Sequence, residues 1–228
     1  MRHLAAAFVA AAAVAAAFAA PGGATNECRG IQACIRVPGP WVVVPAQGTA
    51  SYLLTCPQGR SIVGGLDAQA TSRAVRVSFD GRLGAPVAPG QTTTRYAFFR
   101  AVSTSGHTEA FQPLIGCIPV QGGGGRSTVS ARAVTPAGPA LEYRSRIVVI
   151  GPGDVKFARV ACLRTETLVG AWHAIAFRTK QPPNLRRVGL VRAQHAIVGK
   201  RVVVTASSTD ALSPDAHAIV QAGAECAP

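Results

Sequence analysis

Charged residues are scarce in this chain, and acidic residues are the scarcest. The 228 residues include 10 Asp and Glu against 23 Lys and Arg, and charged residues make up 14% of the chain against 48% hydrophobic residues. A disordered chain has the opposite balance, with low hydrophobicity and a high density of charge. The composition therefore excludes a disordered protein, and the length suits one large folded domain or two small ones.

The sequence also lacks the common catalytic and cofactor motifs. It contains no G-x-S-x-G, no H-E-x-x-H, no C-x-x-C and no glycine-rich phosphate loop with a lysine. Gly122 to Gly125 are uninterrupted glycines and are typical of a linker. We therefore expect no catalytic residue, cofactor site or metal site, although His107 with Glu109 is a weak candidate pair and His173 is expected to be an exposed strand residue.

The N-terminus predicts export. A basic start at residues 1–3 precedes an Ala-rich apolar run from Leu4 to Ala20, which is typical of a secretory signal peptide. The run is shorter than the ~20 strongly apolar residues of a membrane span. Residues 1–24 are the predicted signal peptide, with cleavage after Ala19 or Ala24, and the remaining chain is expected to be secreted or envelope-associated with no integral membrane span.

The six cysteines are expected to form disulfides in an oxidising compartment, although their number alone allows fifteen pairings. An internal repeat narrows the choice. Residues 41–68 align without a gap on residues 147–174, with six identities in 28 positions that include Cys56 with Cys162. Each copy also ends near a cysteine that has a proline two residues later, Cys117 and Cys226. The repeat predicts the pairs Cys56–Cys117 and Cys162–Cys226, which leaves Cys28 for Cys34.

Short apolar or alternating runs between Gly and Pro turns predict about six strands in each copy. One of those predicted in the second copy runs from Leu185 to Ala193. The predicted fold is all-β, with two tandem antiparallel sandwich-like or barrel-like modules that arose by duplication. One fused sandwich with a shared core is the alternative, because each copy has only about 80 residues. The expected segments after the signal peptide are a disulfide-containing N-terminal segment, 25–40, the first module, 41–121, a Gly/Pro-rich connector, 122–143, and the second module, 144–228.

The motif Cys56-Pro57-x-Gly59 followed by Gly64-Gly65, together with the run Gly39 to Pro45, resembles a group of exported proteins from high-GC actinobacteria. That resemblance implies tandem β-rich, disulfide-closed repeats behind an Ala-rich signal peptide. It implies no catalytic residue. The second copy departs from the motif, with Leu163 and Thr165 in place of the proline and glycine.

Positive charge is concentrated in the second half. Residues 126–201 carry fourteen basic and three acidic side chains, a net charge of +11. Strand alternation is expected to place many of them on a solvent-exposed face, where they would attract anionic envelope polymers, acidic lipid headgroups or extracellular nucleic acid. The alternative is a solvated exterior whose charges only resist aggregation and protect strand edges. The predicted contact residues are Arg178, Lys180, Arg186, Arg187, Arg192, Lys200 and Arg201. The aromatic residues nearby, Tyr143, Phe157, Trp172 and Phe177, are expected in the core.

These features favour an exported, non-catalytic module that binds at the cell surface or outside the cell, with an anionic envelope polymer or another polyanion as the expected partner. Two alternatives stay open. One is a secreted hydrolase of envelope or extracellular polymer, because two carboxylates distant in sequence can meet in space. The other is an enzyme inhibitor that presents the loop 80–91 or the loop 181–184.

Overall fold

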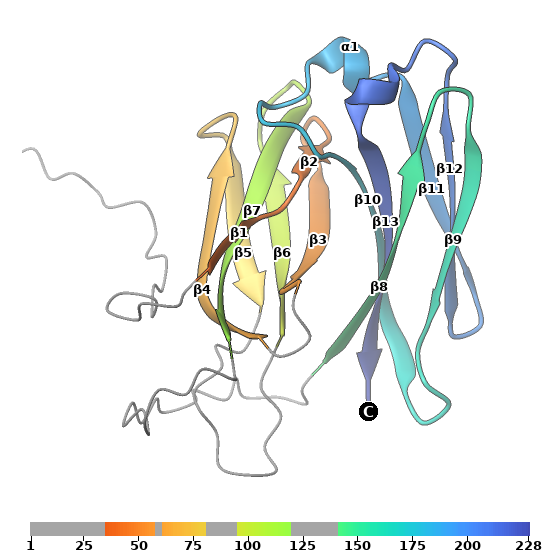
Figure 1. The fold of residues 1–228 in the computed structure, drawn as a ribbon. Helices are drawn as coiled ribbons and strands as arrows, with labels where there is room; N and C mark the ends of the chain where they lie inside the picture. The colour runs from red at the N-terminus through yellow and green to blue at the C-terminus, as the bar shows by residue number, and fades with distance from the viewer. Residues whose placement is uncertain (1–34, 58–60, 81–94, 120–140) are drawn as a thin grey trace, which may run out of the picture.

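The computed structural model describes residues 35–57, 61–80, 95–119 and 141–228 (Figure 1). The predicted signal peptide, Cys28 with Cys34, and most of the predicted connector and of the loop 80–91 lie outside these residues. Within them no helix has the length and apolar character needed to cross a membrane.

The described residues form an all-β, antiparallel fold with one short α-helix, as the sequence predicts. The strands of the first half are β1 (Ile35–Pro38), β2 (Trp41–Val44), β3 (Thr49–Thr55), β4 (Ser61–Ala70), β5 (Val75–Asp80), β6 (Tyr96–Ser103) and β7 (Glu109–Pro119). Those of the second half are β8 (Glu142–Ile150), β9 (Val155–Ala161), β10 (Thr167–Phe177), β11 (Val191–Val198), β12 (Arg201–Ser208) and β13 (Ala218–Ala227).

The two halves pair their strands in the same order. In the first half β7 lies between β2 and β4, and a separate sheet runs β3-β6-β5; in the second half β13 lies between β8 and β10, and the separate sheet runs β9-β12-β11. The registers match as well. Val42 lies opposite Phe111 as Val148 lies opposite Val220, two pairs that join equivalent strands.

Strand β2 joins the halves into one sheet. It pairs with β7 on one side and with β10 on the other, where Trp41 lies opposite Phe177 and Val42 opposite Ala176. All four residues of β2 are buried, which explains the run of apolar side chains in a strand that has a neighbour on each edge. The resulting seven-stranded sheet curls through both halves (Figure 1).

Each half is closed by one of the predicted disulfides. Cys56 bonds to Cys117 and Cys162 bonds to Cys226, with Cα–Cα distances of 5.9 and 5.6 Å. Both bridges tie the segment after the third or ninth strand to the last strand of the same half. The pairings inferred from the repeat are therefore confirmed for these four cysteines.

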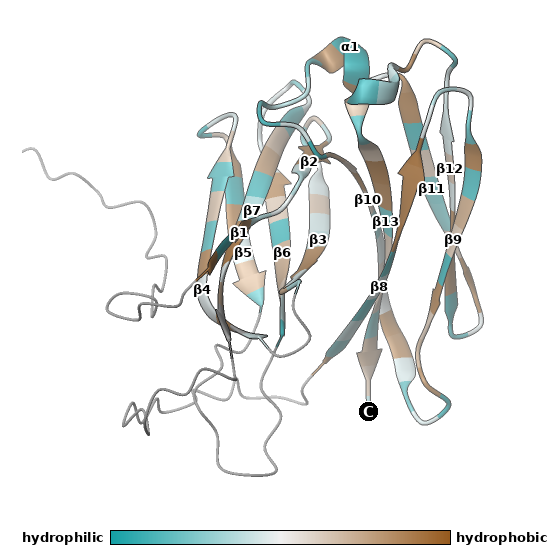
Figure 2. Ribbon diagram, viewed as in Figure 1, coloured by the Kyte–Doolittle hydropathy of each residue, from teal (hydrophilic) through white to brown (hydrophobic). Residues whose placement is uncertain are grey.

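Strand β13 is buried on both of its faces. Ala218, Val220 and Ala222 pack into the core of the second half, whereas Ile219 packs against the first half. Figure 2 shows hydrophobic residues along much of β8, β10 and β13, the layer that lies between two other sheets. A strand with no solvent-exposed face needs apolar or small residues at every position, and β13 supplies them from Ala218 to Ala224 with one polar exception.

That exception is Gln221, whose side chain completes the backbone hydrogen bonding of β3. The Leu53 N–H donates to Gln221 Oε1 at 2.8 Å, and Gln221 Nε2 donates to the Leu53 carbonyl at 2.9 Å. Gln221 is 0% exposed. The primary amide thus acts like a neighbouring strand and holds the middle of β3 in the first half against β13 in the second.

Aromatic side chains fill the space beside this contact. Trp172 lies across Gly223, its partner on β13, so closely that a Cβ there would come within 1.9 Å of the indole. Phe98 stacks on Tyr143 with ring centroids 4.3 Å apart and meets Trp172 edge to face at 4.8 Å. Glycine at 223 is therefore required by the close approach of the indole.

Polar contacts surround the aromatic cluster. Arg100 pairs with Glu225 at 3.1 Å, Tyr96 donates its hydroxyl to Glu142, and Tyr143 donates to Asp80. On the outward side of β3-β6-β5, Leu53 and Phe98 are thus buried against β8, β10 and β13, with Tyr96 partly buried beside them, whereas Arg100 and Val102 stay exposed. We call this side, which is covered around Leu53 and Phe98, the covered face.

One predicted strand is wrong at its start. The segment from Leu185 to Ala193 was expected to be extended, but Leu185–Val188 form helix α1 and β11 begins at Val191. The Asn184 side chain accepts a hydrogen bond from the Arg187 N–H at 2.8 Å and caps the turn. Prolines at 182 and 183 and the glycine at 189 limit the helix to a single turn.

Replacing Gln221 tests the contact between the halves. We expect Gln221→Ala to reduce the free energy of unfolding by about 2–4 kcal/mol, because it leaves the N–H and C=O of Leu53 buried without partners. Gln194→Ala, on the exposed side of β11, is the control and should change it by less than ~0.5 kcal/mol. Equal stability of Gln221→Ala and wild type in urea unfolding would contradict the assigned role.

Peptide mapping without reduction tests the remaining disulfide. The two bridges described here use four of the six cysteines, so we expect a peptide pair that contains Cys28 and Cys34. Mass spectrometry of a digest at low pH, where thiol exchange is slow, should show this pair together with the Cys56–Cys117 and Cys162–Cys226 bridges, and no other linked peptides. Free thiols at both positions, or a link between two molecules, would refute the prediction.

Candidate polyanion-binding surface

Four of the seven predicted polyanion-contact residues lie at one end of the second half. Arg178 and Lys180 follow β10, and Arg186 and Arg187 are on α1 (Figure 1). The helix is attached to the core through Val188, which packs with Leu190 against the second hydrophobic cluster. The four cations are exposed or half-exposed and none has an ion-pair partner among the described residues.

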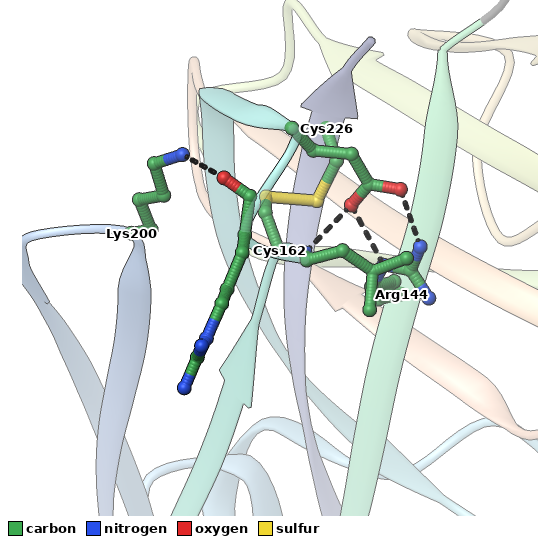
Figure 3. The surroundings of a disulfide bond; sticks show 7 residues. Arg144, Cys162, Lys200 and Cys226 are labelled. Atoms are coloured by element: carbon green, nitrogen blue, oxygen red, sulfur yellow. Dashed lines mark hydrogen bonds and ion pairs between the residues drawn. A yellow bond between two sulfur atoms is a disulfide. The ribbon is translucent and has the colours of Figure 1, made fainter.

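Lys200 lies at the opposite end, beside the Cys162–Cys226 disulfide, and its carbonyl accepts a hydrogen bond from the Cys162 N–H (Figure 3). Arg201 follows it and pairs with Ala161 of β9. The Lys200 ammonium donates to the Arg164 carbonyl at 2.8 Å. Nearby, Glu166 accepts hydrogen bonds from Arg144 at 2.6 Å and from the Leu163 N–H at 2.8 Å. The hydrogen bond from Arg144, followed by that from Leu163, lowers the pKa of the Glu166 carboxyl below its ordinary value.

The structure therefore separates the predicted contact residues. Strand β11 spans the distance between the two groups, and its eight residues cover about 23 Å. Arg192 lies at the α1 end of β11 and Arg201 at the other end of the neighbouring strand β12. One compact basic cluster is excluded, because Arg192 and the four residues near α1 lie at one end of the module, whereas Lys200 and Arg201 lie at the other.

A solvent-exposed surface extends between the two groups, on the outward side of β9-β12-β11. Ala158, Val202, Val204 and Ala206 are 0% exposed, so the residues that alternate with them point away from the core. We call this the open face. It consists of four residues from each strand, Val155, Phe157, Arg159 and Ala161 of β9, Arg201, Val203, Thr205 and Ser207 of β12, and Arg192, Gln194, Ala196 and Val198 of β11.

The open face contains a residue that was expected in the core. Phe157 is 58% exposed, and its pairing partner on β12 is Thr205. Among the other three aromatic residues expected there, Phe177 and Trp172 are buried and Tyr143 is partly buried. The prediction for Phe157 was wrong because side chains in a strand alternate between the two faces. Ala158 points into the core, so its neighbours in β9 point to solvent.

In the candidate pair of His107 and Glu109, the carboxylate is hydrogen-bonded by two neighbouring hydroxyl groups. His107 lies in a bend before β7, and the Glu109 carboxylate accepts hydrogen bonds from Thr71 at 2.7 Å and Ser105 at 3.0 Å. His173 is half-buried rather than exposed. Its Nδ1 lies 2.8 Å from Nδ1 of His195 on β11, a contact that the sequence analysis missed.

One cluster of metal-ligand residue types occurs in the described part of the chain, Cys162 with Glu166 and Cys226. Its two sulfur atoms are bonded to each other, so neither is a thiolate that could bind a metal. No protein family, curated protein or solved structure matches this chain. The open face and the basic ends must be interpreted from their own residues.

The contact between His173 and His195 predicts an acid-sensitive fold. Burial, and then the charge of His195, lower the pKa of His173 below 6.5. The unfolded chain therefore binds more protons than the folded chain near that pH, so stability should fall as pH falls through 6.5. Urea unfolding at pH 8 and pH 5 should show a larger loss of stability for wild type than for His173→Leu.

His217→Asn is the matched control, because His217 is exposed and has a left-handed backbone with φ of 46° that Asn tolerates. It should lose as much stability on acidification as wild type. A His173→Leu protein that loses as much as wild type would show that the histidine contact is not responsible.

Proposed function

We propose that this protein is an exported, non-catalytic β-repeat protein that binds an anionic partner at the cell surface or outside the cell through its basic second half. The distribution of unpaired charge carries the proposal. The described second half, 141–228, has twelve basic and six acidic side chains, a net charge of +6. Only Arg144 and Lys156 of these twelve form ion pairs with described residues.

The other ten cations are exposed or half-exposed, and they attract anions over about a Debye length, roughly 8 Å at physiological salt. They are Arg146, Arg159, Arg164, Arg178, Lys180, Arg186, Arg187, Arg192, Lys200 and Arg201. Because they occupy both ends and the outward side of one module, an extended partner fits them better than a small ion. An anionic polymer or a charged surface has this extent.

Export is supported by two independent features. The Ala-rich run after a basic start has the form of a signal peptide. Disulfides of the kind that close each half persist in oxidising compartments. The matching strand order and registers of the halves support an origin by duplication, in which the second copy acquired most of the positive charge.

Binding to heparin, a soluble polyanion, tests the proposal. We expect retention that weakens as salt is raised, and Arg186→Gln with Arg187→Gln should reduce affinity roughly 2- to 20-fold. Arg73→Gln with Arg76→Gln is the matched control, since it removes the same charge from exposed positions of the first half. Salt-independent retention, or equal weakening in the two double variants, would contradict binding through the second half.

A further inference from the structure

We propose that the open face of β9-β12-β11 lies on a membrane surface rich in anionic phospholipid headgroups. This inference rests on the proposed function and assigns it a partner of definite chemistry. Three arginines on this face, Arg159, Arg192 and Arg201, would contact the headgroups. Phe157 and the valines would enter the boundary between headgroups and acyl chains.

The composition of the open face is unusual for the solvent side of a sheet. An antiparallel sheet with one wet face normally alternates apolar residues inside with polar residues outside. Here half of the outward positions are apolar, namely Val155, Phe157, Ala161, Ala196, Val198 and Val203. Val155 and Val198 are 63% and 62% exposed. No acidic residue is present, so the face combines apolar surface with positive charge alone.

The first half shows what the equivalent face does when it has a partner. The covered face of β3-β6-β5 occupies the same position in the strand order, and β8, β10 and β13 pack on it. Where the halves meet, Arg100 pairs with the carboxylate of Glu225 at 3.1 Å, whereas Arg76 on the same side is exposed. A partner for the open face must likewise supply apolar surface together with anions.

An anionic membrane meets both requirements. Phosphate and carboxylate groups of a soluble polyanion pair with arginine but offer no hydrocarbon in which to bury valine. Single-stranded nucleic acid binds by stacking on several aromatic residues, and the open face has one. A second copy of this chain placed face to face would bring arginines together without carboxylates to pair them. Lipid headgroups over acyl chains supply charge and hydrocarbon in one surface.

Vesicle binding by the purified protein tests this. We expect binding to vesicles of 30% phosphatidylglycerol in phosphatidylcholine, and little binding to pure phosphatidylcholine. Phe157→Trp should show a blue-shifted emission that brominated acyl chains quench, because the new indole enters the bilayer boundary. Trp41 and Trp172 are buried in the fold and provide a constant background.

Two open-face variants, each with a matched control, test whether the arginines and the apolar residues of this face contribute specifically to vesicle binding. Arg159→Gln with Arg192→Gln and Arg201→Gln should weaken vesicle binding roughly 100-fold. Phe157→Ser should weaken it about tenfold. The controls are Lys180→Gln with Arg186→Gln and Arg187→Gln for charge, and Leu185→Ser for an exposed apolar side chain on α1. Each control should weaken binding less than its partner, at unchanged near-ultraviolet circular dichroism.

The outcomes distinguish this inference from the function on which it rests. Heparin retention without vesicle binding would overturn the membrane surface and leave the proposed function standing. Absence of both would overturn both. Vesicle binding that Phe157→Ser leaves unchanged, or tighter binding to a single-stranded oligonucleotide that the open-face arginine variant abolishes, would also overturn the membrane inference.

Discussion

The burial of β13 on both faces is the constraint on which the rest of the structure depends. A strand in this position has no contact with water, so each of its side chains must be apolar, small or fully hydrogen-bonded. Alanine and glycine at alternating positions let sheets approach from both sides. Gln221 is the one fully buried polar side chain in the strand, and it is satisfied by the backbone of Leu53 from the other half.

Because β13 must be covered on both faces, the equivalent three-stranded sheets of the two halves have different surroundings. The first half packs its β3-β6-β5 sheet against β13 and the strands beside it. In that contact Phe98 packs on Tyr143 and Trp172, and Arg100 pairs with Glu225. The second half has the equivalent sheet, β9-β12-β11, with nothing packed on its outward side in the described part of the chain. Arginine and valine there replace the aromatic residues, and this difference carries the proposed binding role.

Much of the architecture could be predicted because it depends on local pattern. Alternation and turn residues located most strands, and the repeated cysteines fixed two disulfides. The cap of Asn184 was missed because a single helical turn has no periodicity to detect. The contact of Gln221 with Leu53 joins residues 168 positions apart, and no local signal marks such a pair.

The candidate site was predicted less well than the fold. The seven basic residues were identified by charge density along the chain, which carries no information on which end of a module each occupies. Arg159 was omitted because it lies in a strand with a mixed pattern, and Phe157 was placed in the core because aromatic residues usually are. His195 is a single residue, and only the packing of β11 against β10, a strand of a different sheet, brings it to His173.

Native-state hydrogen exchange at the Leu53 amide tests most directly whether β13 joins the halves. Its acceptor is the side chain of Gln221, so its exchange depends on the contact between the halves rather than on a strand ladder. The structure predicts that Leu53 exchanges as slowly as the amides of β13, through the same global unfolding event. Exchange as fast as that of exposed loop amides would show that the halves separate, and would remove the distinction between the covered and open faces.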